Sequence, residues 1–294
     1  MRVTDSQFMY TTQHALMRQN IKLNQVYEQI TTGKRINHIS DDSVGWNQVQ
    51  RLNRSLAMNE AYKTTIGRVE TEYMRYETVV KQQEEIAQQI NELIIQGRNG
   101  ALDAASREGL VIELEGLKEE MISLLNTQVD GRYIFSGTDE GSAAISDVPP
   151  YNLLGNDDRR QVQVSETKII NGNFVASEVL GTSDILNQLD AVIGEFKNPT
   201  ADFEQITGDG LDAAIDFHHS VLSTLTKIGA TGNTLDRLLE ASEDMGVFTE
   251  NMRDGLESLN MADAATRLNQ TELMLQATQA TYMKLVSNSL FNYI

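Results

Sequence analysis

Apolar side chains recur every seven residues near both ends of the chain, in segments where most other positions are Gln, Asn, Thr or charged. Such a narrow stripe is typical of a helix that packs on other helices, and it is too narrow to form a domain core. It predicts helices over roughly residues 5–31 and 261–290. We expect them to form an assembly interface that is marginal or disordered alone and ordered when neighbouring subunits bury it. The two stripes consist of Met9, Leu16, Leu23 and Ile30, and of Met261, Leu268, Leu275 and Tyr282.

Longer helices are predicted for the middle of the chain, where apolar residues alternate in steps of three and four. One begins near Ser43 and runs to about residue 96. A second begins at Asp103 and pairs with the first as a helical hairpin through a leucine-rich stripe. Two more helices, from about Asp209 and from Asn233, are expected to pack on this hairpin.

Two joints are predicted between the terminal helices and the middle of the chain. After Leu259 the seven-residue register resumes at Met261, an offset of two residues where a continuous stripe needs three or four. On the N-terminal side, the loop 33–42 separates the first helix from the second. We expect the hydroxyl of Ser40 to cap the second helix, with the two aspartates that follow it beside the positive helix end.

Residues 137–206 are predicted to form an insert of mixed secondary structure. Asn171-Gly172, between β-rich flanks, is a strong signal for a two-residue hairpin turn. Residues 183–196 predict one short helix with its apolar side chains on one face. The fold class is therefore mainly α with a smaller β-containing domain, in an elongated chain. The expected domains are a terminal coiled-coil domain (1–42 and 260–294), a helical bundle domain (43–136 and 207–259) and a β-rich outer domain (137–206).

Charge narrows the range of partners. Lys and Arg number 24 against 42 Asp and Glu, which gives a net charge of −18. A chain this acidic repels nucleic acid and anionic lipid, so neither is an expected partner. The absence of cysteine excludes disulfides and thiolate metal sites. We expect neither membrane insertion nor a cleaved secretory signal, because no apolar stretch has the necessary length and flanks.

Side chains at spacings that support catalysis or metal binding are scarce. His219, Asp216 and Asp212 would share one helix face, but acidic helix faces are common in an acidic protein, so we expect no metal there. The chain has no HExxH motif, and Gly33-Lys34 lacks the earlier glycine of a phosphate-binding loop. We expect no catalytic residue, no cofactor and no enzymatic activity. A cytoplasmic coiled-coil adaptor, with terminal helices ordered in solution, is the alternative from another class of protein.

Three segments resemble the flagellin superfamily. QITTGKRINHISDDSVGW at residues 29–46 is similar to the signature that follows the first helix of these proteins. GRYIFSGT at 131–138 and LVSNSLFNYI at 285–294 resemble the branch of hook–filament junction proteins more than filament flagellins. The residues that carry the first two matches are Gly33, Lys34, Arg35, Ile36, Asn37, Ser40, Asp41 and Asp42, and Gly131, Arg132, Tyr133, Ile134, Phe135 and Gly137.

The resemblance implies a structural subunit of the bacterial flagellum, located outside the cell at the junction of hook and filament. It implies a terminal coiled coil, an adjoining helical bundle and an outward β domain. The expected partners are copies of the chain itself in a ring, the first hook–filament junction protein, flagellin and an export chaperone, with export in an unfolded state by the flagellar type III apparatus. A filament flagellin is the alternative function. The C-terminal segment adds Leu285, Leu290 and Phe291 to the expected assembly interface.

Overall fold

The computed structural model describes residues 2–99, 103–181 and 184–291, without the side chains of residues 2–6, 285 and 288–291. Contacts within the chain divide it into two compact units. Unit 1 consists of residues 1–58 and 244–294, and unit 2 of residues 59–243. The division into terminal, bundle and outer domains stays a prediction.

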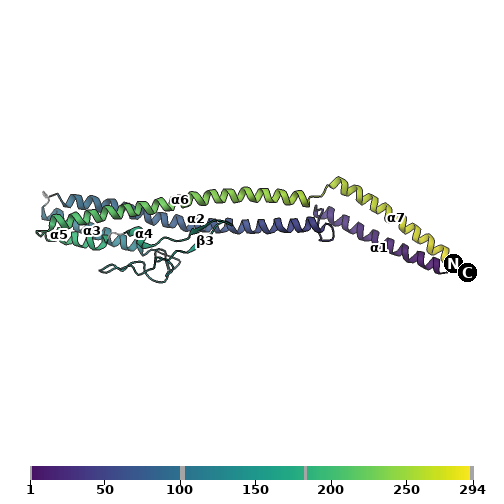
Figure 1. Cartoon of the computed structure of the whole chain (residues 1–294), viewed down its shortest axis with the longest axis horizontal. Coiled ribbons are helices and arrows are strands. Elements are labelled where there is room, and N and C mark those ends of the chain that lie inside the picture. The colour runs from purple at the N-terminus through teal and green to yellow at the C-terminus, as the bar shows by residue number, and fades with distance from the viewer. Residues whose placement is uncertain (1, 100–102, 182–183, 292–294) are drawn as a thin grey trace. The chain divides into compact units, whose positions relative to one another are not determined.

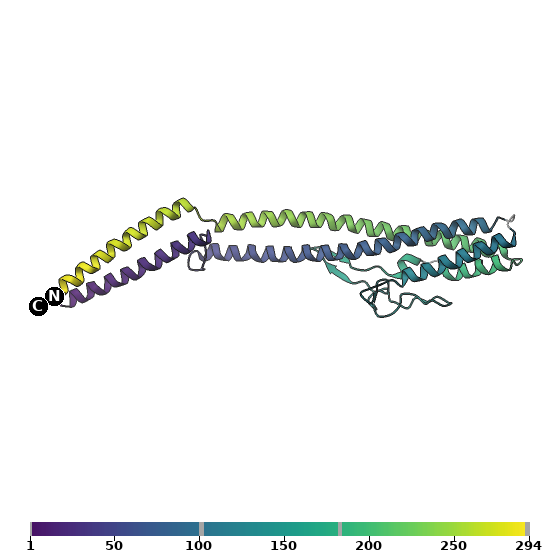
Figure 2. The same cartoon turned by 180° about the vertical axis from the view of Figure 1, so that it is seen from behind.

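Unit 1 is built around the two terminal helices, α1 (Arg2–Thr32) and α7 (Met261–Phe291). They lie side by side, as Figures 1 and 2 both show. Helix α1 ends before the loop 33–42, and residues 258–260 separate α7 from the preceding helix. Helices therefore break at both predicted joints, and the terminal helices extend slightly beyond the predicted bounds.

Unit 2 contains the main apolar core. It takes in most of α2 (Ser43–Gly97) and α6 (Phe203–Glu257), together with α3 (Ala104–Leu125) and α5 (Ile185–Lys197). Ile66, Leu114, Leu189 and Phe217, one from each helix, are fully buried in a single cluster. As predicted, Asp103 caps α3 by accepting a hydrogen bond from the backbone amide of Ser106 at 2.9 Å. Among the described helices, no segment reaches the length and apolarity needed to cross a membrane.

The prediction of two helices starting near Asp209 and Asn233 was wrong, because α6 is continuous from Phe203 to Glu257. Gly229 and Gly232 lie inside it, and a Cβ atom at either position would meet nothing within 4 Å. Glycine in a helix costs only about 1 kcal/mol relative to alanine. Burial of Ile228 and Leu235 in the same stretch of the helix offsets that cost and keeps the helix intact.

The insert in unit 2 contains little regular β structure. A short hairpin, β1 (Gln128–Val129) with β2 (Arg132–Tyr133), precedes it, and β3 (Gln161–Gln163) pairs antiparallel with β4 (Ile169–Asn171). Helix α4 (Ala176–Leu180) follows, and then α5, whose predicted apolar face is buried.

The prediction of a turn at Asn171-Gly172 was wrong. Asn171 pairs with Gln161 at the end of the hairpin, and the connection between β3 and β4 runs through residues 164–168. The amide of Gly172 donates to the carbonyl of Arg160 at 2.6 Å, so the chain is still paired at this glycine. A Cβ atom at Gly172 would lie 2.7 Å from the side chain of Val162. Gly172 therefore permits the end of β4 to approach β3 closely and does not form a turn.

Candidate functional site

The terminal helices contact each other, and most residues of the predicted stripes are half-buried in this pair. Val26 on α1 and Ala264 on α7 are buried, whereas Met261 is 54% exposed. Because few side chains are fully covered, apolar burial within the pair is small. The side chains of Leu285, Leu290 and Phe291 lie outside those described. The remaining stripe residues are half-buried: Met9, Leu16, Leu23 and Ile30 on α1, and Leu268, Leu275 and Tyr282 on α7.

Polar side chains also connect the two helices. The hydroxyl of Tyr27 donates to a carboxylate oxygen of Glu272 at 2.8 Å. This hydrogen bond, together with the negative charge of Glu272, raises the pKa of Tyr27. Gln29 is buried, accepts from the guanidinium of Arg267 at 3.4 Å and donates to the carbonyl of Arg35 at 2.8 Å. Gln29 thus links α7 to the loop after α1.

A clasp, defined here as residues 33–42 with residues 256–259, holds the loop after α1 against the end of α6. The amide of Arg35 donates to the carbonyl of Glu257 at 2.6 Å, and the amide of Leu259 donates to the carbonyl of Gly33 at 3.1 Å. The ammonium of Lys34 lies 2.8 Å from the Glu257 carboxylate, which is largely buried. Gly33 has a φ of +69°, a conformation that glycine adopts without strain. The clasp therefore joins two segments that are more than 200 residues apart in the sequence.

Two aspartates order the loop within the clasp. Asp41 accepts from the amides of Asn37 and His38 at 3.0 and 2.9 Å, and from the side chain of Gln25 at 2.7 Å. Partial burial acts to raise the pKa of Asp41, but the hydrogen bonds from these backbone and side-chain donors outweigh it and lower the pKa. Asp42 accepts from the amide of Gly45 at 2.9 Å, which lowers the pKa of Asp42 and caps α2.

The prediction that Ser40 caps α2 was therefore wrong. Asp42 directly precedes Ser43, the first helical residue, and its carboxylate accepts a hydrogen bond from the amide of Gly45, three residues after Asp42. Ser40 is exposed and has no hydrogen-bond partner among the described side chains. The buried side chain of Ile36 fills the loop, and a Cβ atom at Gly45 would lie 2.6 Å from its Cδ1 atom. Gly45 is required for this close contact.

The second signature segment, residues 131–137, lies in unit 2. Asp130 and Gly131 both have positive φ, 54° and 76°, and form the tight turn between β1 and β2. Phe135 is buried against the ring of Tyr76, whose hydroxyl donates to the carbonyl of Ile134 at 2.9 Å. Burial raises the pKa of Tyr76 to about 12. These contacts fasten the segment to α2.

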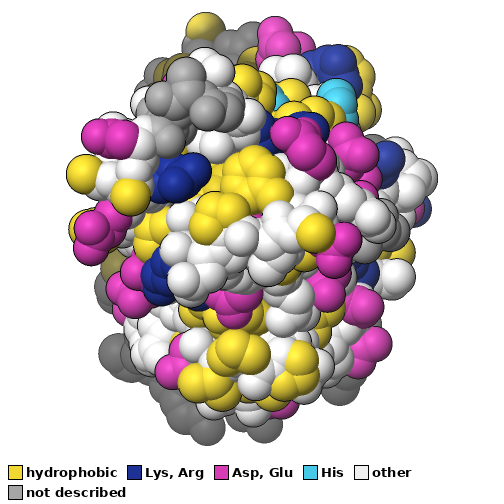
Figure 3. All heavy atoms as spheres, turned by 90° about the vertical axis from the view of Figure 1, so that its left-hand side faces the viewer, with side chains coloured by type: hydrophobic (Ala, Val, Ile, Leu, Met, Phe, Trp, Pro, Cys, Tyr) yellow, Lys and Arg dark blue, Asp and Glu magenta, His cyan; other side chains and the backbone are white. Residues whose placement is uncertain are grey.

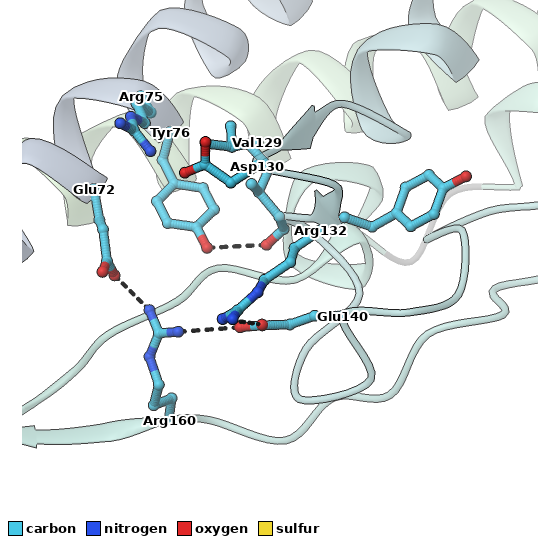
Figure 4. Close-up of a pocket in the computed structure, with 10 residues that line it drawn as sticks. Glu72, Arg75, Tyr76, Val129, Asp130, Arg132, Glu140 and Arg160 are labelled. Carbon is cyan, nitrogen blue, oxygen red and sulfur yellow. Dashed lines mark hydrogen bonds and ion pairs between the residues drawn. The ribbon is translucent and has the colours of Figure 1, made fainter.

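A cavity of about 330 Å³ lies beside this segment (Figure 4). The guanidinium of Arg160 spans it, binding the carboxylates of Glu72 and of Glu140, and Arg132 also binds Glu140 at 3.1 Å. These charges compensate one another, and the lining side chains form no arrangement of a nucleophile with a base. The cavity is best explained as the polar attachment of the insert to α2.

The structure leaves a second set of apolar side chains in unit 1 exposed, and the sequence analysis did not assign them to the assembly interface. On α1, Tyr10, Met17 and Ile21 lie away from the face that packs on α7, and Tyr10 also contacts His14 edge-to-face at 4.3 Å between ring centroids. The steps of four, three and four along Tyr10, His14, Met17 and Ile21 are the signal that would have revealed them. The exposed set comprises Phe8, Tyr10, Met17, Ile21 and Tyr27 on α1, Met245, Val247, Phe248 and Met252 on α6, and Leu273, Met274 and Met283 on α7.

The net charge belongs entirely to unit 2. Unit 1 carries 10 basic and 10 acidic residues, whereas unit 2 carries 14 basic and 32 acidic residues. Figure 3 shows acidic side chains spread over the face of unit 2 seen in that view. Copies of the chain can therefore approach through unit 1 without repulsion between net charges, while their acidic units repel one another.

Comparison with known proteins finds similarity to flagellar proteins in both sequence and structure. Residues 5–140 match the family model for the bacterial flagellin N-terminal helical region. Flagellar hook-associated protein 3 of Escherichia coli K12 is 26% identical over 89% of this chain and 83% of its own length. The same protein of Salmonella typhimurium is 24% identical over 90% of both chains. A solved structure of a flagellar hook-associated protein from Vibrio parahaemolyticus is 28% identical, with a TM-score of 0.70 over 74% of this chain and all of that one.

The expected resemblance is thus confirmed on both sequence and fold, and among the two flagellar branches it favours the hook-associated proteins over filament flagellins. The two signature segments lie within the matched region, the first as the loop 33–42 of the clasp and the second as residues 131–137, which begin in the turn of the β1–β2 hairpin. The chain is therefore similar to the flagellin superfamily in sequence and fold, and within it to flagellar hook-associated protein 3, FlgL.

Proposed function

We propose that this chain is a structural, non-catalytic subunit of the bacterial flagellum that forms the junction between hook and filament. The observation that carries the proposal is the terminal helix pair. Its two helices bury few side chains against each other and leave large apolar side chains exposed. Exposed apolar surface on this scale usually marks an interaction site. Similarity to flagellar hook-associated protein 3 supports a place in the flagellum.

The mechanism is assembly by completion of a helical interface. In the free chain, α1 and α7 are marginally stable because their packing leaves most apolar side chains half-buried or exposed. Contact with neighbouring copies covers these side chains and orders both helices. The clasp keeps the pair attached to the end of α6, so a force applied to the pair reaches the longer helices through hydrogen bonds and an ion pair.

The partners follow from the same proposal. Copies of the chain form a ring whose one side meets the first hook–filament junction protein and whose other side meets flagellin. The chain leaves the cell unfolded through the flagellar type III apparatus, and an export chaperone binds it beforehand. Marginal stability of the terminal helices favours this route, because little free energy is needed to unfold them.

Labelling of isolated flagella tests the proposal. An antibody against unit 2 should mark a narrow zone at the distal end of the hook, and mutants without the chain should release flagellin into the medium. Label along the whole filament would contradict a junction function and support a filament flagellin. Label confined to the cytoplasm would support the coiled-coil adaptor.

A further inference from the structure

Methionine is concentrated in unit 1, and most of its side chains are exposed there. Nine of the 11 methionines belong to unit 1, whereas unit 2 has two, Met74 and Met121. Met121 is completely buried, and Met74 is 55% exposed. Unit 1 therefore carries most of the exposed thioether groups among the described residues. Seven of its methionines are between 47% and 67% exposed: Met17, Met58, Met245, Met252, Met261, Met274 and Met283.

The thioether is the only sulfur group of the chain, because the sequence contains no cysteine. Peroxides oxidise a thioether to a sulfoxide. The sulfur attacks one peroxide oxygen, and the O–O bond breaks as the S–O bond forms. The second oxygen leaves as hydroxide and takes up the proton of the first to give water, so sulfur loses two electrons and the peroxide gains them. The product is a polar side chain in place of an apolar one.

Exposed methionines of unit 1 stand beside other apolar side chains that have no cover within the chain. On α6, Met245 and Met252 lie three and four residues from Phe248, which is 61% exposed. On α1, Met17 lies one turn before Ile21, which is 66% exposed. Methionine suits surfaces that adapt to a partner, because its side chain is unbranched and flexible. These are the faces that the proposed function covers with neighbouring molecules.

We propose that the exposed methionines of unit 1 are oxidation sites for peroxides, and that their conversion to sulfoxides prevents the chain from entering the flagellum. A sulfoxide oxygen buried against an apolar neighbour is an acceptor without a donor, which should weaken binding about tenfold for each such side chain. The effect on assembly rests on the proposed function, whereas oxidation of the free chain depends on exposure alone.

Mass spectrometry after treatment with hydrogen peroxide tests the sites. Met245 and Met74 are a matched pair, because both are 55% exposed and they belong to different units. In the purified chain both should become sulfoxides at rates within about twofold of each other, with Met121 unmodified. In isolated flagella the oxidation of Met245 should be at least about tenfold slower than that of Met74, because a neighbouring molecule covers Met245. Equal rates in flagella would overturn the inference.

Binding to hooks measures the consequence of oxidation. Purified chain is added to isolated hooks that carry the first junction protein and lack this chain, and the bound chain is quantified. Chain oxidised with hydrogen peroxide should bind at least about tenfold less than untreated chain, and subsequent treatment with methionine sulfoxide reductases should restore binding. Circular dichroism should be the same for oxidised and untreated chain, because the modified side chains are exposed. Undiminished binding of the oxidised chain would contradict the proposal.

Glutamine substitution provides a second measurement that needs no oxidant. Glutamine is close to methionine in length and replaces the thioether with a polar amide. Met245→Gln should lower incorporation into flagella about tenfold, and the control Met74→Gln should leave it within about twofold of the unmodified chain. Because the two positions are equally exposed, neither substitution should change the urea unfolding transition. Equal incorporation of the two variants would refute the role of Met245.

The outcomes separate this inference from the proposed function. If the oxidised chain and the Met245→Gln variant both enter the hook–filament junction normally, the inference is wrong and the junction function stands. If the unmodified chain is absent from the junction, the proposed function itself fails, and the oxidation rates of the purified chain do not depend on that result.

Discussion

Replacing Asp41 with alanine should loosen the clasp without unfolding unit 2. The Asp41 carboxylate accepts three hydrogen bonds, from the amides of Asn37 and His38 and from the side chain of Gln25, at 2.7 to 3.0 Å. A hydrogen bond to a charged group contributes about 1.5–3 kcal/mol. The total is smaller than the sum because His38 is exposed and water replaces part of the loss. We therefore expect a cost of about 2–3 kcal/mol in the free energy of opening the clasp.

Amide hydrogen exchange measures this cost directly. A loss of about 2–3 kcal/mol corresponds to a roughly 30- to 150-fold faster exchange of the amides in residues 33–42, with unchanged exchange in the core of α2, α3 and α6. Ser40→Ala is the matched control, because Ser40 lies in the same loop without a hydrogen-bond partner among the described side chains. Equal exchange rates in the two variants would refute the role assigned to Asp41.

Further predictions concern packing, hydrogen bonding, pH and salt. Gly45→Ala should also accelerate amide exchange in residues 33–42, because the added methyl group would lie 2.6 Å from Ile36 Cδ1. The control Gly229→Ala, whose methyl group would meet nothing within 4 Å, should leave this exchange unchanged or slow it. Tyr76→Phe leaves the Ile134 carbonyl without its 2.9 Å hydrogen bond and should lower the free energy of unfolding of unit 2 by about 1–2 kcal/mol in urea titrations. The pKa of both clasp aspartates is lowered, so their carboxylates stabilise the clasp at pH values above the unfolded-state pKa of 3.8. This stabilisation is lost as the pH falls through their lower folded-state pKa values, and amide exchange in residues 33–42 measured between pH 5 and 2 should show the loss. Assembly of the purified chain should accelerate as salt rises, because about 0.1 M salt screens the repulsion between acidic units beyond about 10 Å, and salt-independent assembly would contradict this.

The helices and their joints were predictable because they depend on local spacing. The seven-residue stripes located α1 and α7, and the register slip after Leu259 located the break before α7. The failures arose where two local signals competed. Ser40 and Asp42 are both good capping residues, and only the turn at residues 38–41 decides that Asp42 stands next to α2. The break predicted before Asn233 is absent, because Ile228 and Leu235 are buried on either side of Gly229 and Gly232 and keep α6 continuous.

The contacts of the clasp could not be predicted from spacing. Lys34 and Glu257 are separated by more than 200 residues, and neither position carries a local signal that names the other. The second apolar face of α1 has helical spacing in the sequence, but spacing alone does not show whether Met17 and Ile21 have a partner within the chain. Exposure of Met17 and Ile21 in the folded chain is what identifies that face as unsatisfied.

Deletion of residues 285–294 tests most directly whether the terminal helix pair drives assembly. The truncated chain should fail to enter the hook–filament junction, because α7 loses its last turns and with them part of the surface that neighbouring copies cover. The urea unfolding transition of unit 2 should be unchanged, since its core draws on residues between 66 and 239, far from the deleted segment. Normal incorporation of the truncated chain would contradict assembly through the terminal helices.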